Sequence, residues 1–420
     1  MFNKRVKSVL IILEGLLVGG LETRLKGEVS TLVSKGVKVY FLIIAHDNVL
    51  DKSIFNWYNV EDIFILESNN RRSIGFFIDV IDFLNTIIID KKLELLYVHD
   101  AFTALIGTLA ARINNINCCM TIHGVMNFHV LSEIEKKIFK DVVIPNLSHI
   151  NFVSNEVQDT FLPWVDDRKV TNVHSNLINT FRFKKILEKS VDERWLIICR
   201  LSKEKLPGIL DFLKYAHKAG IKGIVIAGEG GDRTYFENSI VELGLGNFVE
   251  FIGQQYDIPK LINHFSGVAG VGRVVLEAIA CERPACVLGF FGGVKGLVTP
   301  LNFERFQYSN FSGRNLASIS NKDFEEQLNV HNNENLYILR KKLEDHFSES
   351  KKWPEFIENY ITVLKLPTNC IVSSNLIKSL YAQSCYFAPE MSDYFITSDF
   401  FINNILFPLL ENHASRSDLG

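Results

Sequence analysis

Cysteine is scarce in this sequence, and long uninterrupted apolar runs are lacking. Its 420 residues include 7 cysteines without Cys-x-x-Cys spacing, so neither a disulfide framework nor a zinc site is indicated, and free thiols fit a reducing compartment. The first apolar run, residues 6–18, contains Lys7 and Glu14 and is too short to span a bilayer. We therefore expect a cytoplasmic protein without a signal peptide, with at most a peripheral contact at the inner face of the cell membrane.

An excess of charge of one sign is also lacking. Lysine and arginine number 45 and aspartate and glutamate 48, for a formal net charge of -3. This balance gives no electrostatic reason to expect nucleic acid as a partner. Hydrophobic residues make up 47% of the chain and charged residues 22%, as is typical of a globular protein with a large core. The length exceeds what one core usually supports, so two domains are expected.

Strand and helix patterns alternate along the first part of the chain. Residues 6–13 end in a continuous apolar run typical of a parallel strand buried on both faces. Further elements are expected as a strand at 37–44, a helix near 75–90, a strand at 95–98, a helix near 102–113 and a strand that ends near Ile122. Strands that alternate with helices indicate a doubly wound parallel sheet, which we assign to a domain at residues 1–180.

A second alternating series begins at residue 194. Its strands are expected at RWLIICR, KGIVIAG, FVEFIG and PACVLG, and its helices at 208–219, 233–243, 258–265 and 274–280. This predicts a second Rossmann-like domain at residues 181–350. An amphipathic helix at 351–366 is expected to pack back toward the N-terminal domain. Residues 367–420 form an aromatic-rich extension, for which packing or self-association is favoured over a lipid contact.

The residues suited to chemistry follow predicted strands. Arg200 and Lys205 lie in R-L-S-K-E-K, at a strand-to-helix junction from which both could reach a diphosphate. Such cations would stabilise the charge that develops on a departing nucleoside diphosphate, in place of a metal. Taken alone, these six residues favour the alternative of a solvated basic loop.

Three further segments follow strands. Gly270 and Gly272 precede a helix whose N-terminus would favour anionic groups, and Glu277 in that helix could accept hydrogen bonds from ribose hydroxyls. The alternative is a tight turn with a surface glutamate. His123, in T-I-H-G, ends a strand of the first domain, although a lone histidine is more often structural. The pair Gly19-Gly20 could admit substrate or simply begin a helix.

Together these segments resemble the family-four glycosyltransferases, the large retaining group with the GT-B fold of two facing Rossmann-like domains. The resemblance spans roughly residues 8–365. It rests on GGLET, TIHG, FVS at 152–154, NLIN at 176–179, RLSKEK, AGEG at 227–230 and LEAIACERP at 276–284. RLSKEK followed by the LEA helix is the most specific combination.

The resemblance implies roles for particular residues. Arg200 and Lys205 resemble the pair that binds the pyrophosphate, and Glu277 resembles the glutamate that binds the ribose. His123 resembles a catalytic-site histidine near the donor sugar and the reacting carbon. The remaining donor-site residues that it implies are Gly19 and Gly20 in a loop that closes over donor and acceptor, Glu229 beside the nucleotide, and Gly270 and Gly272.

One position departs from the family pattern. The family usually carries a second glutamate eight residues before the ribose-binding one, where it contacts hydroxyls of the donor sugar, but here that residue is Ala269. A methyl group cannot accept those hydrogen bonds. Arg273 could offer a phosphate contact in partial compensation. The departure leaves open which sugar is transferred and whether its anomeric configuration is retained or inverted.

The resemblance implies a hexosyltransferase-type enzyme that moves a sugar from a nucleoside diphosphate donor, UDP favoured over GDP, to a glycan or lipid-linked glycan. Surface-polysaccharide or O-antigen synthesis in bacteria is the expected setting, with no cofactor and no metal. A homo-oligomer or a synthase complex could form through the C-terminal extension. Two alternatives stay open: a nucleotide-sugar epimerase of the same fold, and a non-catalytic glycan-binding or scaffold subunit.

Overall fold

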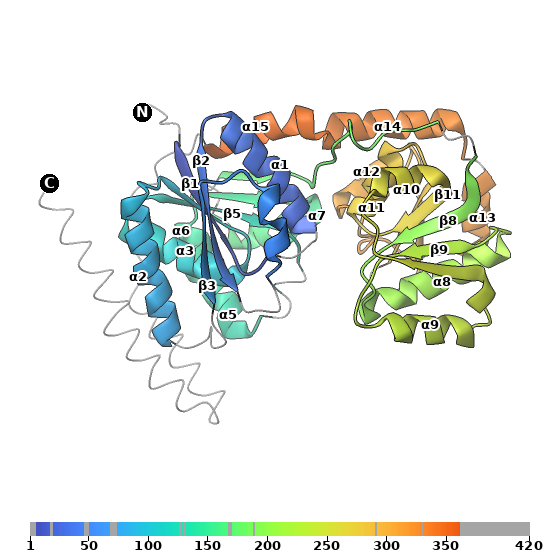
Figure 1. Ribbon diagram of the computed structural model, residues 1–420, viewed down its shortest axis with the longest axis horizontal. Helices are drawn as coiled ribbons and strands as arrows, with labels where there is room; N and C mark the ends of the chain where they lie inside the picture. Colours follow the sequence, from blue (N-terminus) through green and yellow to red (C-terminus); the bar gives the residue numbers. More distant parts are fainter. Residues whose placement is uncertain are drawn as a thin grey trace, which may run out of the picture. The chain divides into compact units, whose positions relative to one another are not determined.

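The computed structural model describes residues 6–16, 20–45, 50–67, 74–125, 128, 131–166, 170–187, 190–289, 292–329 and 331–361. The chain forms two compact units (Figure 1). Of the described residues, the first unit takes in those up to Val153 together with 157–174 and 353–361, and the second takes in 154–156 and 175–352. The domain limits expected at 180 and 350 lie near these changeovers. Gly19, residues 362–366 of the predicted last helix and the extension 367–420 lie outside the described residues.

The first unit is built on a seven-stranded sheet in which every neighbouring pair of strands is parallel, in the order β3-β2-β1-β4-β5-β6-β7. The strands are β1 (Ser8–Leu13), β2 (Lys38–Ala45), β3 (Asp62–Glu67), β4 (Leu95–Val98), β5 (Asn117–Ile122), β6 (His149–Phe152) and β7 (Val170–Val173). All residues of β1 and β4 are buried, as expected of central parallel strands covered on both faces.

Helices cover both faces of this sheet, with α2 and α3 on one side and α1 on the other (Figure 1). The helices assigned here are α1 (Gly20–Ser34), α2 (Ile74–Asp90), α3 (Ala101–Ile113), α5 (Glu133–Ile138), α6 (Ile144–Asn146), α7 (Asn155–Phe161) and α15 (Glu349–Ile361). Asp100 caps α3, because its carboxylate accepts a hydrogen bond from the Thr103 amide. From Trp353 onward α15 belongs to the first unit.

The second unit has a six-stranded sheet in the order β10-β9-β8-β11-β12-β13. Its strands are β8 (Asp192–Ile198), β9 (Ile224–Ala227), β10 (Val249–Gly253), β11 (Phe265–Gly270), β12 (Ala285–Leu288) and β13 (Val294–Leu297). The first five are parallel, whereas β13 runs antiparallel to β12. Each unit is thus a doubly wound α/β domain, as the sequence predicts, and the second unit has one additional antiparallel edge strand.

Two apolar layers flank the second sheet. The helices are α8 (Leu206–Lys218), α9 (Arg233–Glu242), α10 (Ile258–His264), α11 (Arg273–Ala280), α12 (Phe303–Tyr308), α13 (Asn321–Asn329) and α14 (Asn333–Phe347). One layer packs α10, α11, α12 and α14 onto the sheet, and the other packs α8, α9 and α13. Leu196 and Ile197, neighbours on β8, point into opposite layers, as the two-residue period of a strand requires.

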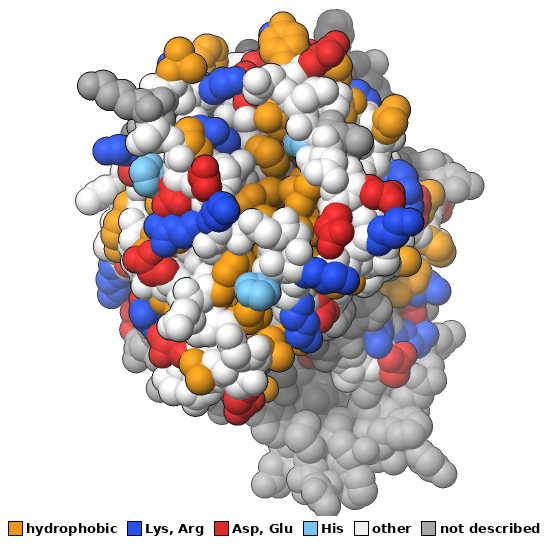
Figure 2. All heavy atoms as spheres, turned by 90° about the vertical axis from the view of Figure 1, so that its right-hand side faces the viewer, with side chains coloured by type: hydrophobic (Ala, Val, Ile, Leu, Met, Phe, Trp, Pro, Cys, Tyr) orange, Lys and Arg blue, Asp and Glu red, His pale blue; other side chains and the backbone are white. Residues whose placement is uncertain are grey.

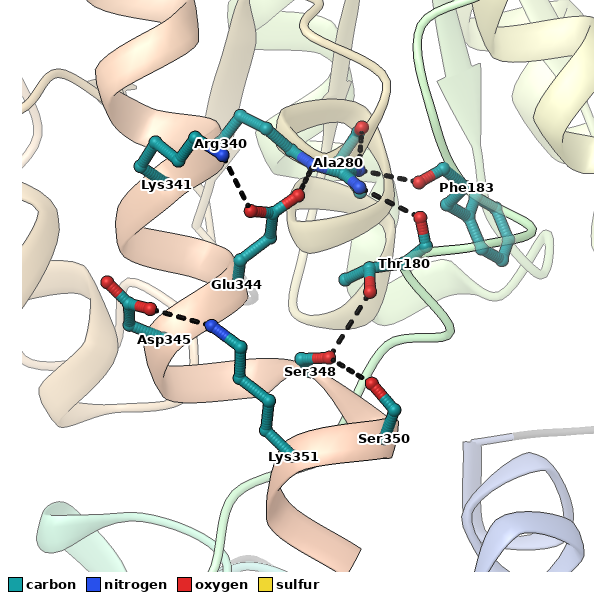
Figure 3. Close-up of polar contacts among 10 residues, drawn as sticks. All are labelled: Thr180, Phe183, Ala280, Arg340, Lys341, Glu344, Asp345, Ser348, Ser350 and Lys351. Carbon is teal, nitrogen blue, oxygen red and sulfur yellow. Dashed lines mark hydrogen bonds and ion pairs between the residues drawn. The ribbon is translucent and has the colours of Figure 1, made fainter.

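Arg340 fixes the segment at 180–183 to the second unit (Figure 3). From α14 its guanidinium donates to the carbonyl oxygens of Phe183 at 2.6 Å and Thr180 at 2.8 Å, and to that of Ala280 at the end of α11. Its Nε donates to Glu344 at 2.8 Å. Arginine suits this task because its planar fork directs several N–H groups at once.

Basic and acidic side chains alternate around hydrophobic ones on the face of the second unit drawn in Figure 2. This mixture agrees with the near-balanced composition of the chain. Within the described residues, no helix combines the length and the apolar character needed to cross a membrane.

Candidate active site

Three loops that carry predicted site residues follow β9, β8 and β11, which are neighbours in the second sheet, and β12 lies next to β11. In the order β9-β8-β11-β12 these strands are parallel, so their carboxyl ends meet at one edge, where ligands bind in folds of this kind. Residues 228–232 follow β9, residues 199–205 follow β8, and residues 271–272 follow β11. The structure therefore brings the AGEG, RLSKEK and LEA segments to the same edge of one sheet.

Arg200 and Lys205 lie at this edge, and neither is paired with an acidic side chain among the described residues. Arg200 follows β8 with an exposed side chain, and Lys205 ends a short 3-10 turn (Lys203–Lys205) directly before α8. Within the part of the chain that the structure describes, neither side chain forms a hydrogen bond or an ion pair. The carboxylate of Glu204 between them bonds instead to the Ser202 hydroxyl at 2.5 Å. This bond, with smaller contributions from Lys205 and Arg200, lowers the pKa of Glu204.

The glycines of AGEG are explained by close backbone packing against the Arg200 segment. A side chain at Gly228 would collide with the Cys199 carbonyl oxygen, and one at Gly230 would collide with the Leu201 carbonyl oxygen. The Leu201 amide donates to the carbonyl of Glu229 at 3.0 Å. These two loops therefore support one another, and glycine is needed where their backbones touch.

Glu229 directs its side chain toward α9. Its Oε1 accepts a hydrogen bond from Arg233 at 2.8 Å, and both side chains are more than a third exposed. The predicted role of Glu229 beside a nucleotide stays a prediction. A ligand there would meet a carboxylate that already has a cationic partner.

The LEA helix begins with an unusual backbone conformation at Gly272. This residue caps α11 with φ +68°, in the region that favours glycine, and its amide donates to the Phe311 carbonyl at 2.8 Å. Gly270, the last residue of β11, is buried. The two glycines thus shape a tight turn from β11 into α11. Such a turn is compatible with ligand binding, and the predicted role of the glycines in the donor site stays a prediction.

Arg273 and Glu277 form a pair one turn apart on α11. Arg273 Nε donates to Glu277 Oε1 at 2.9 Å, and its Nη1 donates to the Leu177 carbonyl at 2.9 Å. Burial raises the pKa of Glu277, and Arg273 opposes this effect. Arg273 is thus engaged within the protein through Nε and Nη1, and the phosphate contact that it could offer stays a prediction. Glu277 Oε2 accepts no hydrogen bond from the described residues and can face a ligand.

Ala269 lies inside the second sheet. It is fully buried and pairs with Cys286 of β12 on one side and with Ile197 of β8 on the other. Its methyl group packs in the apolar layer that contains α8, α9 and α13 and can accept no hydrogen bond from a sugar. Groups that recognise the sugar must therefore come from other positions.

In the first unit, His123 forms a pair with a second histidine. His123 directly follows β5 and His99 directly follows β4, and His99 Nδ1 lies 2.9 Å from His123 Nε2. Burial lowers the pKa of His123 to about 3, with help from the positive charge of Arg24. Burial likewise holds the pKa of His99 well below its usual value, with help from His123 and Arg24. Both imidazoles are therefore neutral near pH 7.

A buried polar layer lies beneath α1 next to this pair. Arg24 donates to the His174 carbonyl at 3.0 Å, and its Nε lies 3.9 Å from the Glu28 carboxylate. Burial raises the pKa of Glu28 to about 7, although Arg24 and a hydrogen bond with Tyr97 lower it. Tyr97 also contacts the hydroxyl of Thr121. Polar groups in a domain core are costly unless they are paired, so this layer is a notable feature of the first unit.

The last helix, α15, covers part of this polar layer. The Arg24 guanidinium lies over the rings of Trp353 and Phe356, at 5.3 and 5.5 Å from their centroids. A side chain at Gly27 of α1 would collide with Trp353. Gly20 begins α1, and a side chain there would meet nothing within 4 Å, so packing does not require glycine at that position.

His99, Arg24 and Glu28 were not identified from the sequence. His99 could have been, because it follows the strand at 95–98 just as His123 follows its own strand. Arg24 and Glu28 stand in an ordinary amphipathic helix, and only the fold shows that they face the sheet. Among the described residues, no group of three or more histidine, cysteine, aspartate or glutamate side chains is arranged to hold a metal ion. Metal-independent catalysis stays a prediction.

Known proteins support the class that the fold and the site indicate. The model of Glycosyltransferase Family 4 matches residues 18–180, and the model of Glycosyl transferases group 1 matches residues 181–316. The chain is a glycosyltransferase of the GT-B class. No curated protein sequence matches the chain.

Solved structures share the fold over most of this chain. Anabaena Alr3699/HepE, in a complex with UDP, is 16% identical, with 84% of this chain and 99% of that chain covered and a TM-score of 0.66. The lipopolysaccharide outer core galactosyltransferase WaaB is 15% identical, with 84% of this chain and 99% of that chain covered and a TM-score of 0.60. Sucrose-phosphate synthase from Thermosynechococcus elongatus is 14% identical, with 84% of this chain and 98% of that chain covered and a TM-score of 0.64.

Proposed function

We propose that this glycosyltransferase binds a UDP-sugar at the carboxyl edge of the second sheet and transfers the sugar to a hydroxyl of a glycan or lipid-linked glycan. Arg200 and Lys205 bind the diphosphate, and Glu277 binds the ribose. The observation that carries the proposal is the pair of uncommitted cations at the end of β8, one strand away from the turn that leads to Glu277. Such cations can stabilise the diphosphate as it departs.

The structural relatives support the choice of donor and of pathway. HepE has been crystallised with UDP and with UDP-glucose, and WaaB acts in the outer core of lipopolysaccharide. We therefore favour UDP over GDP, and synthesis of a bacterial surface polysaccharide such as an O-antigen. Retention of the anomeric configuration is expected from the resemblance to family four, as is catalysis without a metal. The free thiols of the described cysteines fit a cytoplasmic site of action.

The diphosphate assignment can be tested by thermal shift with UDP, GDP, UMP and uridine. A ligand that binds only the folded protein raises the melting temperature as its concentration exceeds Kd. We expect UDP to stabilise the wild type more than UMP does, and Lys205→Ala to abolish that difference. Lys203→Ala is the matched control, since Lys203 lies in the same turn but pairs with Asp232 at 3.9 Å and lies over the Tyr235 ring.

Turnover distinguishes transfer from interconversion of the donor. UDP release that depends on an added glycan acceptor, in the presence of EDTA, is the result expected of a metal-independent transferase, and NMR of the product gives its anomeric configuration. An unchanged UDP response in Lys205→Ala would refute the phosphate assignment. Conversion of the donor without acceptor would refute transfer to a glycan.

A further inference from the structure

The contact between His99 and His123 restricts where their protons can lie. The two ring nitrogens are 2.9 Å apart, so one must carry a hydrogen and the other must accept it. Both rings are neutral, because burial and the charge of Arg24 lower both pKa values. Each ring therefore carries a single N–H, and two arrangements are possible: either His123 donates from Nε2, or His99 donates from Nδ1.

These two arrangements differ at the far side of the His99 ring. His99 is only 4% exposed, and its Nε2 is buried without a hydrogen-bond partner among the residues that the structure describes. If His123 donates, the His99 proton moves to Nε2 and becomes a buried N–H without an acceptor. If His99 donates, Nε2 holds a lone pair instead. Buried N–H groups without acceptors are rare in proteins, and the positive charge of Arg24 favours a lone pair over an N–H in its field. The second arrangement is therefore the more stable.

This arrangement determines which ring nitrogen of His123 carries its proton. When Nε2 of His123 accepts from His99, the His123 proton resides on Nδ1. That nitrogen forms no hydrogen bond within the described residues and is not among their fully buried unpaired atoms, and His123 as a whole is only partly buried, so Nδ1 remains available as a donor. We propose that His99 is a positioning residue that fixes His123 in the Nδ1–H tautomer, so that His123 presents a hydrogen-bond donor to a substrate oxygen at the carboxyl edge of the first sheet. This inference rests on the proposed function for the identity of the ligand, but not for the tautomer.

The tautomer can be measured without any substrate. Long-range ¹⁵N–¹H correlation spectra of the uniformly labelled protein distinguish protonated from unprotonated ring nitrogens, and a spectrum of His123→Gln assigns the signals of His123 among the 11 histidines. The expected result at pH 7 is a neutral His123 with its proton on Nδ1. A proton on Nε2, or a doubly protonated ring, would overturn the inference whatever the enzyme's activity.

Two substitutions of His99 separate hydrogen bonding from packing. The side-chain nitrogen of asparagine reaches the position of histidine Nδ1, whereas that of glutamine reaches the position of Nε2. We expect His99→Gln to lower kcat/KM for the sugar donor by about 10- to 100-fold, as loss of a supporting hydrogen bond typically does. His99→Asn should recover most of this loss. Both should keep the wild-type Kd for UDP, because the proposed diphosphate and ribose contacts lie in the second unit.

The outcomes distinguish this inference from the proposed function. Equal activity of the two His99 variants, with circular dichroism and UDP affinity like those of the wild type, would show that the donor at Nδ1 is irrelevant. A wild-type protein that turns over no nucleotide sugar would refute the proposed function and leave the tautomer to be decided by NMR. If neither variant folds, the spectrum of the wild type still decides.

Discussion

Arg273 Nε donates to Glu277 Oε1 at 2.9 Å across one turn of α11, and the side chains are only 16% and 11% exposed. The arginine also holds the Leu177 carbonyl. The pair thus anchors residues 176–179 to the LEA helix and orients the carboxylate that we assign to the ribose. In this arrangement Arg273 supports Glu277, and its predicted contact with a phosphate stays a prediction.

Removal of this arginine should destabilise the second unit. Arg273→Ala leaves a largely buried carboxylate without its partner, which typically costs about 3 kcal/mol. Lys322→Ala is the matched control, because Lys322 and Glu326 form a pair with the same spacing on α13 at 85% and 64% exposure, where such pairs contribute little. Urea unfolding, read by pulsed hydrogen exchange on peptides of residues 175–352, gives both values. Equal stabilities of the two variants would contradict the structural role of Arg273.

Gly230 and Gly231, adjacent glycines in the loop that follows β9, should respond very differently to substitution by alanine. In Gly230→Ala the new methyl group would collide with the Leu201 carbonyl oxygen, whereas a methyl at Gly231 would meet nothing within 4 Å. Displacement of packed backbone costs about 1 to 3 kcal/mol, and the segment displaced carries Arg200. We therefore expect Gly230→Ala to lower both the stability and the affinity for UDP, as measured by calorimetry. Gly231→Ala should leave both near wild type, and a similar loss in both variants would show that the loops do not depend on this contact.

The sequence predicts the alternation of strands and helices and the segments that follow the strands, but it does not identify β11. Residues 265–270 read FSGVAG, with two glycines and a serine, and such residues have little β-propensity. The strand exists because both of its neighbours, β8 and β12, pair with it. Ala269 could therefore be read only as a missing glutamate, whereas the structure shows a core position between two strands.

The sequence does not predict the polar layer of the first unit, for a different reason. A period of 3.6 residues shows that Leu25, Val29 and Leu32 share a face of α1, but it does not show that Arg24 and Glu28 are also turned inward. That orientation is decided by partners distant in sequence, namely His174 and the rings of α15. Tertiary contacts of this kind override the expectation that charged residues lie outside.

Glu28 should make the stability of the first unit depend on pH. Burial raises its pKa from 4.5 to about 7 in the folded protein, so the folded state retains a proton that the unfolded state releases at lower pH. Its contribution to stability is therefore fully present below about pH 4.5 and is lost as the pH rises to about 7, by about 3 kcal/mol.

Comparison with Glu28→Gln isolates this effect. Glutamine cannot ionise, so the difference in unfolding free energy between the variant and the wild type should shift in favour of the variant as the pH rises from 5 to 8. Loss of the partner of Arg24 adds an offset, but this offset does not follow the titration of residue 28. Urea titrations across this pH range, read on peptides of the first unit, measure the difference. A difference that is flat with pH would show that Glu28 is ionised throughout.

Arg340 and its neighbour Lys341 offer a sharp comparison on α14 (Figure 3). Arg340 is 8% exposed and donates to the carbonyls of Thr180, Phe183 and Ala280, whereas Lys341 makes an exposed pair with Glu344. In Arg340→Met the apolar stem is kept, but three carbonyl oxygens lose a charged donor. Hydrogen bonds to charged groups contribute about 1.5 to 3 kcal/mol each, so the second unit should lose at least about 3 kcal/mol.

Loss of Arg340 should also weaken ligand binding at the proposed site. The Ala280 carbonyl is the last of α11, the helix that carries Glu277, so we expect Arg340→Met to weaken UDP binding in calorimetry even where the protein stays folded. Lys341→Met should match the wild type in both urea unfolding and UDP affinity. Arg340→Lys should be intermediate, because an ammonium group cannot reach three carbonyls with the geometry of a guanidinium. If Arg340→Met were as stable as Lys341→Met, residues 180–183 would have to be held by the hydrophobic contacts of Phe183 instead of by this network.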